Sequence, residues 1–359
     1  MFIIDRAFSS KRLEDFGREN YENSIDADIL FDDENLIKNR LVCEISNAYN
    51  PKLYTNSERA VNWIRKNMGE SIIGKKLEFF KDKYVFRNLI ADSFPNFNYR
   101  KINISETDIP LSFPFIVKPV EGFLSEGIFL ISNNNDWVKF LEQMQNSETS
   151  YIAEEVINGD EFAVDAYFNS QGNPVILNIF KHPFLNDENM ADRLYYTSKK
   201  IIEAQLPTAL GILSDISKYI ELKNFPLHLE YRNGLRGAIP IELNPMRFAG
   251  WCTTELTYYA YQINPYQYFQ KDKSPDWEMI LKEKSPDDMY YFAIAENSMK
   301  LATKSLNKTA FINDFENPLE MNFAKDENIM PIFGVIFGET HKKEEIYKIL
   351  KMDICKYIN

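Results

Sequence analysis

The sequence has few cysteines, a deficit of basic charge and no long apolar run. Its three cysteines, Cys43, Cys252 and Cys355, are widely separated, which argues against a disulfide framework or a zinc site. The longest clean apolar run, 329–337, is far shorter than the roughly 20 residues that span a bilayer. Residues 1–10 lack the basic and apolar regions of a signal peptide. We therefore expect a cytoplasmic protein with reduced thiols and no membrane partner.

The charge balance excludes one large class of partner. Forty-one Lys and Arg residues stand against 53 Asp and Glu residues, for a net charge of −12. A phosphate backbone would meet net repulsion, so we expect no nucleic-acid partner. The length of 359 residues favours two to three domains, and 45% apolar with 26% charged residues is ordinary for a folded chain. These numbers leave a homodimer open.

Three familiar catalytic fingerprints are also missing. Residues 69–76 match a phosphate loop except at Lys76, which replaces the magnesium-binding hydroxyl, and this segment follows a helical pattern instead of a strand. No Gly-x-Gly-x-x-Gly follows a strand, and no Gly-x-Ser-x-Gly elbow occurs. A phosphate-loop nucleotidase, a classical dinucleotide enzyme and a serine hydrolase are therefore disfavoured.

The order of periodic segments predicts a mixed chain, α+β or α/β. Three-and-four spacing of apolar residues predicts one helix over 75–91, and period-two or continuous apolar runs predict strands. Expected strands are 113–118, 128–132, 151–157, 161–168, 175–180, 227–231, 238–243 and 331–337, and further expected helices are 136–144, 207–222, 275–282 and 341–350. Asn158, Gly159 and Asp160 favour a hairpin between two of the strands.

A lysine at the end of a buried strand is the first candidate for phosphate binding. Lys118 ends the run 113–118 and leads into a loop that bears Gly122, Ser125 and Gly127. Glycines allow backbone N–H groups to approach anionic oxygens, and the lysine supplies a point charge. An ordinary strand end beside a turn would give the same pattern.

Two further regions place acids at strand ends. Residues 151–162 place Glu154 and Glu155 at the end of one strand and Glu161 just after a tight turn, where these acids could serve a nucleoside or simply be solvated. At 227–231 and 240–245, alternation puts Glu230, Glu242 and Asn244 on strand faces as an all-oxygen set of the kind Mg²⁺ prefers. A tight turn at 233–234 would leave Glu230 and Glu242 far apart, so the metal interpretation requires a wider or bulged connection.

In combination these pieces resemble the ATP-grasp ligases over about residues 75–255. The resemblance is carried by Lys83, the Lys118 strand and loop, the 154–161 hinge, His228-x-Glu230, and Glu242-x-Asn244 with Arg247. It implies an ATP-grasp fold and MgATP as cofactor, with Mn²⁺ as an alternative metal. Implied nucleotide contacts are Lys83, Lys118, Ser125, Glu154, Glu155, Ile157 and Glu161; implied metal ligands are Glu230, Glu242 and Asn244; implied catalytic residues are Arg247 and Lys118.

The segment 247–251 is similar to one found in bacterial L-amino-acid (dipeptide) ligases. The resemblance implies that Trp251 limits the acceptor pocket, whereas a tryptophan after a strand can equally be a core residue. Arg247 comes one residue later than the family spacing, because Pro245 and Met246 both precede it. His182 and His228 are further substrate-contact candidates, although a Lys-His pair at 181–182 also suits a solvated strand end.

The interpretation that follows is a ligase joining a small carboxylate to an amine through an acylphosphate, with amino-acid or dipeptide-like substrates. Its alternatives are a ligase acting on a peptide or cell-wall precursor, and an ATP-binding protein without turnover. The expected division of the chain is an N-terminal α/β domain at 1–100, a lid subdomain at 101–165, and a C-terminal subdomain with the metal site at 166–359.

Overall fold

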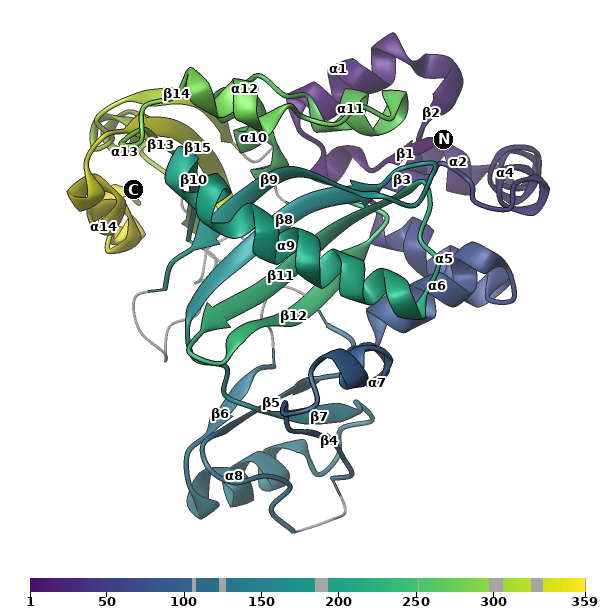
Figure 1. Ribbon diagram of the computed structural model, residues 1–359, viewed down its shortest axis with the longest axis vertical. Helices are drawn as coiled ribbons and strands as arrows, with labels where there is room; N and C mark the ends of the chain where they lie inside the picture. The colour runs from purple at the N-terminus through teal and green to yellow at the C-terminus, as the bar shows by residue number, and fades with distance from the viewer. Residues whose placement is uncertain are drawn as a thin grey trace.

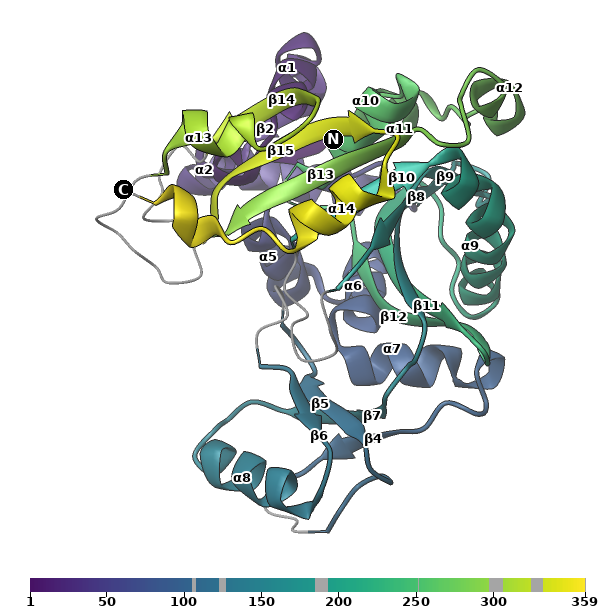
Figure 2. The same ribbon diagram turned by 90° about the vertical axis from the view of Figure 1, so that its left-hand side faces the viewer.

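The computed structural model describes residues 1–104, 108–122, 127–184, 193–250, 252–296, 306–323 and 332–358 of the chain. These residues form three sheets, each with its own helices (Figure 1, Figure 2). No helix in these ranges is long and apolar enough to cross a membrane. Cys43 and Cys355 are exposed free thiols.

A small parallel sheet opens the chain, with strand order β2-β1-β3. Its elements are β1 (Phe2–Ile4), α1 (Lys11–Glu19), β2 (Ser24–Asp26), α2 (Ala27–Asp32), α3 (Glu34–Leu36), α4 (Cys43–Asn47), β3 (Tyr54–Thr55) and α5 (Glu58–Met68). Beyond the carboxyl ends of β1 and β3, the Asp5 N–H donates to Asn56 Oδ1 at 2.8 Å. Crevices beside such strand ends commonly take ligands.

Two helices stand where the sequence predicted one, so the single helix over 75–91 is wrong. The chain forms α6 (Ile72–Lys81) and α7 (Lys83–Ile90), which meet at Asp82. The Asp82 carboxylate accepts the N–H groups of Tyr84 at 2.8 Å and Val85 at 3.0 Å, an N-cap that starts a new helix. This cap makes Lys83 the first residue of α7.

An antiparallel four-stranded sheet forms a separate lobe with strand order β4-β7-β5-β6 (Figure 2). It comprises β4 (Tyr99–Ile102), β5 (Phe115–Pro119), β6 (Phe129–Ile131), α8 (Asn134–Met144) and β7 (Tyr151–Glu155). The helix lays Trp137 and Phe140 against Phe115, and all three side chains are almost fully buried. The lobe thus has an apolar core of its own.

The largest sheet has eight antiparallel strands in the order β12-β11-β8-β9-β10-β13-β15-β14. Its strands are β8 (Asp160–Phe168), β9 (Pro174–His182), β10 (Leu194–Ser198), β11 (Phe225–Gly234), β12 (Gly237–Pro245), β13 (Met289–Glu296), β14 (Pro318–Phe323) and β15 (Ile332–Thr340). The helices are α9 (Lys199–Tyr219), α10 (Leu256–Tyr261), α11 (Pro265–Lys271), α12 (Trp277–Lys282), α13 (Lys308–Asn313) and α14 (Lys343–Leu350). Helix α9 covers one face of β8, β9 and β11 (Figure 1), and one apolar core continues from there into the N-terminal sheet.

Short 3-10 helices connect several of these elements, and one π-helical stretch lies between α3 and α4. The 3-10 helices are Arg6–Phe8, Tyr21–Asn23, Ala91–Ser93, Thr253–Glu255 and Ile354–Tyr357, and the π-helix is Ile37–Val42. The expected division of the chain at residues 100 and 165 stays a prediction.

The β11–β12 hairpin resolves the question of the turn between the two glutamates. Gly234 pairs with Gly237, so the turn lies at Leu235 and Arg236 and not at 233–234. A register shift between Glu230 and Tyr231 follows, and Glu230 then pairs directly with Glu242. The bulged connection required by the metal interpretation is therefore present.

The hairpin expected around Asn158-Gly159-Asp160 is wrong. Strand β7 belongs to the four-stranded sheet and β8 to the eight-stranded one, so residues 156–159 pass between two sheets. Gly159 has φ +132°, and a Cβ there would lie 2.4 Å from the Asn233 carbonyl oxygen. Turn chemistry is present, but it serves close backbone packing against the β11–β12 turn.

Candidate active site

Two glutamates face one another across the β11–β12 hairpin. Glu230 and Glu242 are register partners, and the Asn244 side-chain amide donates to Glu242 Oε1 at 2.8 Å. His228 Nε2 lies 3.5 Å from Glu230 Oε1. The three predicted metal ligands thus lie on adjacent positions of two paired strands.

Lys83 reaches this group from the start of α7. Its Nζ lies 2.9 Å from Glu242 Oε2, and its backbone N–H donates to the Val120 carbonyl at 2.8 Å. Burial alone would raise the pKa of Glu242, but Lys83, then Lys118 and the Asn244 amide, lower it to about 2. Glu242 is therefore ionised at neutral pH, as a metal ligand must be.

A buried ion cluster lies under the predicted phosphate lysine. Lys118 Nζ is 2.7 Å from Glu154 Oε2, and the Arg87 guanidinium donates to Glu154 Oε1 at 2.7 Å. All three side chains are almost completely buried. Burial opposes ionisation of Glu154, yet Arg87 and Lys118 together hold its pKa at about 2. The Glu154 side chain therefore orients Lys118, and Arg87 is a site residue that the sequence reasoning missed.

A second cluster surrounds the predicted ribose acid. Glu161 Oε1 lies 2.9 Å from His182 Nδ1, and the Arg232 Nε–H donates to Glu161 Oε2 at 2.9 Å. Burial opposes ionisation of Glu161, but the His182 hydrogen bond and the charges of His182 and Arg232 lower its pKa. His182 also stacks on Tyr195, with ring centroids 4.1 Å apart. Nothing in the sequence marks Arg232 as a site residue, apart from its position on a strand in which polar and apolar residues alternate.

The predicted hinge residues lie where the chain passes from the four-stranded sheet to the eight-stranded sheet. The Ile157 carbonyl accepts from Arg232 Nη1 at 3.0 Å, and the Ile157 side chain packs with Phe97 and Ile239. Glu155 points away toward Arg236, with Arg236 Nη2 2.6 Å from Glu155 Oε1. Ile157 and Glu161 thus share Arg232, whereas the Glu155 side chain takes part in another pair.

Arg247 follows a left-handed residue at the end of β12. Met246 has φ +64°, is fully buried, and its carbonyl accepts the Thr55 N–H at 2.8 Å. The additional residue before Arg247 is thus accommodated by the left-handed conformation of Met246, which is hydrogen-bonded to β3. The Arg247 guanidinium donates to the Phe248 carbonyl at 3.1 Å, and its Nε lies 3.9 Å from Glu58 Oε1.

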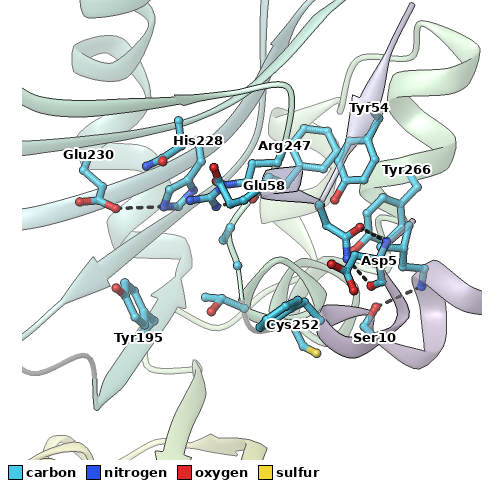
Figure 3. A pocket seen from close by; sticks show the side chains of 18 of the residues that line it. Asp5, Ser10, Tyr54, Glu58, Tyr195, His228, Glu230, Arg247, Cys252 and Tyr266 are labelled. Carbon is cyan, nitrogen blue, oxygen red and sulfur yellow. Dashed lines mark hydrogen bonds and ion pairs between the residues drawn. The ribbon is translucent and has the colours of Figure 1, made fainter. Parts of the chain in front are cut away.

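A cavity of about 470 Å³ opens beside these residues (Figure 3). The eight-stranded sheet supplies one wall with His228, Glu230, Glu242 and Asn244, and Tyr195 and Ile294 also line the cavity. The N-terminal unit supplies Asp5, Phe8, Ser10, Leu13, Tyr54, Asn56, Glu58 and Arg59. The volume of the cavity falls in the range of small-molecule sites, and its lining combines charged and aromatic side chains.

One further buried acid lies next to the cavity. Asp165 on β8 is fully buried, and its Oδ1 accepts from His228 Nδ1 at 2.8 Å and from the Ala249 N–H at 2.7 Å. Burial would lower the pKa of His228, but hydrogen bonds to Asp165 and Glu230 raise it to about 9. The one sequence signal for Asp165 is its position as a single acid inside the apolar part of a strand.

The donor set fits a magnesium ion held partly by phosphates. Among the described residues, no three His, Cys, Asp or Glu side chains are grouped as a complete metal site. Two carboxylates and one amide oxygen are hard donors, and Mg²⁺ commonly takes one or two carboxylates plus substrate phosphates. Of the other predicted site residues, Ser125 and Trp251 lie outside the described residues.

This geometry agrees with a family comparison. Residues 111–255 match the model of the ATP-grasp domain family, a stretch that includes Lys118, both glutamate strands and Arg247. The match covers about two fifths of the chain and falls within residues 75–255, where the sequence resemblance predicted an ATP-grasp domain. No curated protein matches the chain.

Solved structures extend the likeness over most of the chain. L-amino acid ligase from Bacillus licheniformis is 16% identical, with a TM-score of 0.63 over 92% of this chain and 85% of that one. N5-carboxyaminoimidazole ribonucleotide synthetase from Thermotoga maritima is 15% identical, with a TM-score of 0.61 over 89% and 84%. The biotin carboxylase domain of Hydrogenobacter thermophilus 2-oxoglutarate carboxylase, in complex with MgADP, is 12% identical, with a TM-score of 0.53 over 74% and 63%. The ATP-grasp fold is confirmed, and the predicted enzyme class, an ATP-dependent ligase, agrees with it.

Proposed function

We propose that the protein is an ATP-dependent ligase that joins a small carboxylate to an amine, in the cytoplasm. The observation that carries this proposal is the pairing of Glu230 with Glu242 beside Lys83, at one end of a cavity that also holds Arg247. A paired acid set, a cation and a small-molecule cavity are the parts needed to bring a nucleotide phosphate to a carboxylate.

Each part of the bound MgATP and of the acid substrate has a proposed binding residue in this chain. Lys83 and Lys118 hold the phosphates, the crossing at Ile157 receives the adenine, and Glu161 takes the ribose hydroxyls. Glu230, Glu242 and Asn244 hold Mg²⁺, or Mn²⁺ in its place, which neutralises charge on the phosphates when bound. Arg247 orients the substrate carboxylate toward the γ-phosphorus.

The chemistry needs no nucleophilic side chain. A carboxylate oxygen attacks the γ-phosphorus and the bond to the ADP oxygen breaks, which gives an acylphosphate and ADP. The amine nitrogen then attacks the acyl carbon, loses a proton, and phosphate leaves. Phosphate is a far better leaving group than hydroxide, which is why the two reactions are coupled. Positioning and exclusion of water are therefore the main contributions of the protein.

Amino-acid or dipeptide-like substrates suit the cavity best. Arg247 offers a cation for a carboxylate, while Phe8, Tyr195 and Ile294 supply apolar surface for a side chain. The similar Bacillus licheniformis protein is an L-amino acid ligase by its description. The role of Trp251 in limiting the acceptor site stays a prediction from the sequence resemblance.

A phosphate-release screen tests the proposal. Purified protein with MgATP is offered pairs of amino acids and small acids, phosphate is measured continuously, and products are identified by mass spectrometry. We expect phosphate release only when a carboxylate and an amine are both present, and a loss of about 100-fold or more in Glu242→Gln. Glu344→Gln, an exposed change on α14, is the matched control and should retain full activity. Release that ignores the second substrate, or full activity in Glu242→Gln, would contradict the proposal.

A further inference from the structure

Asp165 connects two parts of the cavity wall that are far apart in sequence. Its Oδ1 accepts from His228 Nδ1 at 2.8 Å on β11, and from the Ala249 N–H at 2.7 Å in the segment that follows Arg247. Because both donors share one oxygen atom, a shift of either donor changes the position available to the other. The same acid thereby touches the strand of Glu230 and the segment of Arg247.

The burial of Asp165 is difficult to explain by stability alone. The side chain is fully buried, and among the described residues its Oδ2 has no hydrogen-bond partner. A buried carboxylate with an unsatisfied oxygen is costly, and a whole buried ion pair can often be replaced by apolar residues of similar volume without loss of stability. Such a group therefore points to a role other than holding the sheet together.

His228 carries the connection to the proposed metal side. A carboxylate only accepts hydrogen bonds, so Nδ1 of His228 must carry the proton toward Asp165. The ring orientation is then fixed, and Nε2 is directed toward Glu230 at 3.5 Å (Figure 3). Removal of a group that hydrogen-bonds to a metal-ligating side chain, as His228 would to Glu230, commonly lowers metal affinity or activity.

We propose that Asp165 is a positioning residue that aligns Glu230, through His228, with the substrate segment 247–250, through the Ala249 N–H. This inference rests on the proposed ligase function, because it assigns Glu230 to the metal nucleotide and Arg247 to the acid substrate. Asp165 itself touches neither. Its task is to keep the two binding groups in register while the acyl group and the phosphate meet.

The histidine rings give a direct readout. The chain has three histidines, His182, His228 and His341, so ring ¹⁵N signals can be assigned by single His→Gln variants. In Asp165→Asn we expect the His228 ring signals to move, because a carboxylate acceptor has been replaced by an amide, while His182 and His341 stay in place. Unchanged His228 signals would overturn the inference.

The backbone amide of Ala249 tests the coupling without any turnover. In the wild-type protein, MgADP should shift both the His228 ring signals and the Ala249 amide signal, the latter assigned by its loss in Ala249→Gly. In Asp165→Asn the Ala249 response should be lost while MgADP still binds by calorimetry. If MgADP does not shift the Ala249 amide signal of the wild-type protein, the proposed coupling is wrong. Since no substrate pair is needed, this result stands apart from failure of the ligase proposal.

Kinetics separate positioning from a structural effect. We expect Asp165→Asn to lower kcat by about 10- to 100-fold with the KM for ATP changed by no more than about twofold. Asn178→Ala is the matched control, because Asn178 is the fully buried register partner of Asp165 on β9 and bonds to Thr257 and Thr197. The control should lower the melting temperature but keep kcat.

A double variant completes the test. If Asp165 acts through His228, then Asp165→Asn combined with His228→Gln should lose no more activity than the worse single variant. Full multiplication of the two losses would show independent roles and overturn the inference, as would wild-type kcat in folded Asp165→Asn. Should Asp165→Asn fail to fold, His228→Gln is measured alone, and an unchanged Ala249 response to MgADP in that variant counts against the proposal.

Discussion

At the residue scale, the site depends on acids that are kept ionised inside the protein. Glu154 is the strongest example, because it lies buried between Arg87 and Lys118 and its pKa is about 2. Removing its charge would leave two buried cations without a counter-ion. Such a change costs about 3–5 kcal/mol in buried pairs.

Glu154→Gln should therefore destabilise the fold strongly at neutral pH and weaken nucleotide binding by misplacing Lys118. The folded-state pKa lies below the ordinary value of 4.5, so the stability from ionised Glu154 is full above about pH 4.5 and is lost as pH falls toward 2. Denaturant unfolding at pH 7 and pH 3 measures this, and the difference from wild type should shrink at pH 3. The neighbouring Glu155→Gln, whose partner Arg236 is half exposed, should change stability by less than about 1 kcal/mol.

The alternation of polar and apolar residues along strands explains which site residues could be predicted from the sequence. Glu230, Glu242 and Asn244 were predicted because alternation on a strand places polar side chains on one face. Asp165, Arg87 and Arg232 were not, because each is a single polar residue whose partner is supplied by a strand or helix distant in sequence. Their roles arise from pairing between elements, which local spacing does not encode.

At the element scale, the crossing from β7 to β8 is held by close contact with the β11–β12 turn. Gly159 permits this because its φ is +132° and a side chain would meet the Asn233 carbonyl. Gly159→Ala should therefore cost about 1–3 kcal/mol and raise the KM for ATP, since the crossing is the proposed adenine site.

Gly211→Ala on α9 is the control for this change, because a Cβ placed there would meet no described atom within 4 Å apart from its chain neighbours and the nearby backbone of its own helix. An alanine in a helix interior should be neutral or stabilising by about 0.5–1 kcal/mol. Thermal unfolding and ATP titrations of both variants provide the comparison. Equal stability of the two variants would show that the close approach at Gly159 has no energetic consequence.

Two elements were wrongly predicted for the same reason. The run 75–91 has a continuous helical pattern, and only the Asp82 side chain, which caps α7, divides it. Residues 158–160 have turn chemistry, but the strands on either side pair with different sheets. In both cases the local propensity is present in the sequence, but a cap or the pairing of distant strands decides the structure.

At the scale of the whole molecule, the three sheets meet around one set of charges. The sequence predicted the ATP-grasp fold from the order of its motifs, but not the extent of contact made by the first 70 residues. Tyr54 of β3 packs on Phe248 with ring centroids 5.4 Å apart, and the N-terminal unit lines much of the cavity. Those residues lack a distinctive motif, so only the folded chain places them at the site.

A second contact between distant parts of the chain, α1 and the segment after Arg247, involves Glu255, a buried acid whose pKa is raised. Glu255 accepts from Ser10, the N-cap residue of α1, and lies 3.5 Å from Arg12 Nε, while Arg12 stacks on Tyr258 at 3.5 Å. Burial raises the pKa of Glu255 from 4.5 to about 7, against the lowering effects of Ser10 and Arg12. The contact between the N-terminal helix and the segment after Arg247 should therefore respond to pH.

The sign of this response is opposite to that of Glu154. Because folded Glu255 holds its proton more tightly than the unfolded chain, its contribution favours folding below about pH 4.5 and is lost as pH rises through 7. The shift corresponds to at most about 3 kcal/mol. Glu255→Gln keeps an acceptor for Ser10 without the charge, so its stability relative to wild type should increase between pH 5 and pH 8. Denaturant unfolding across that range measures the difference, and a constant difference would mean that Glu255 is ionised throughout and that Arg12 outweighs burial.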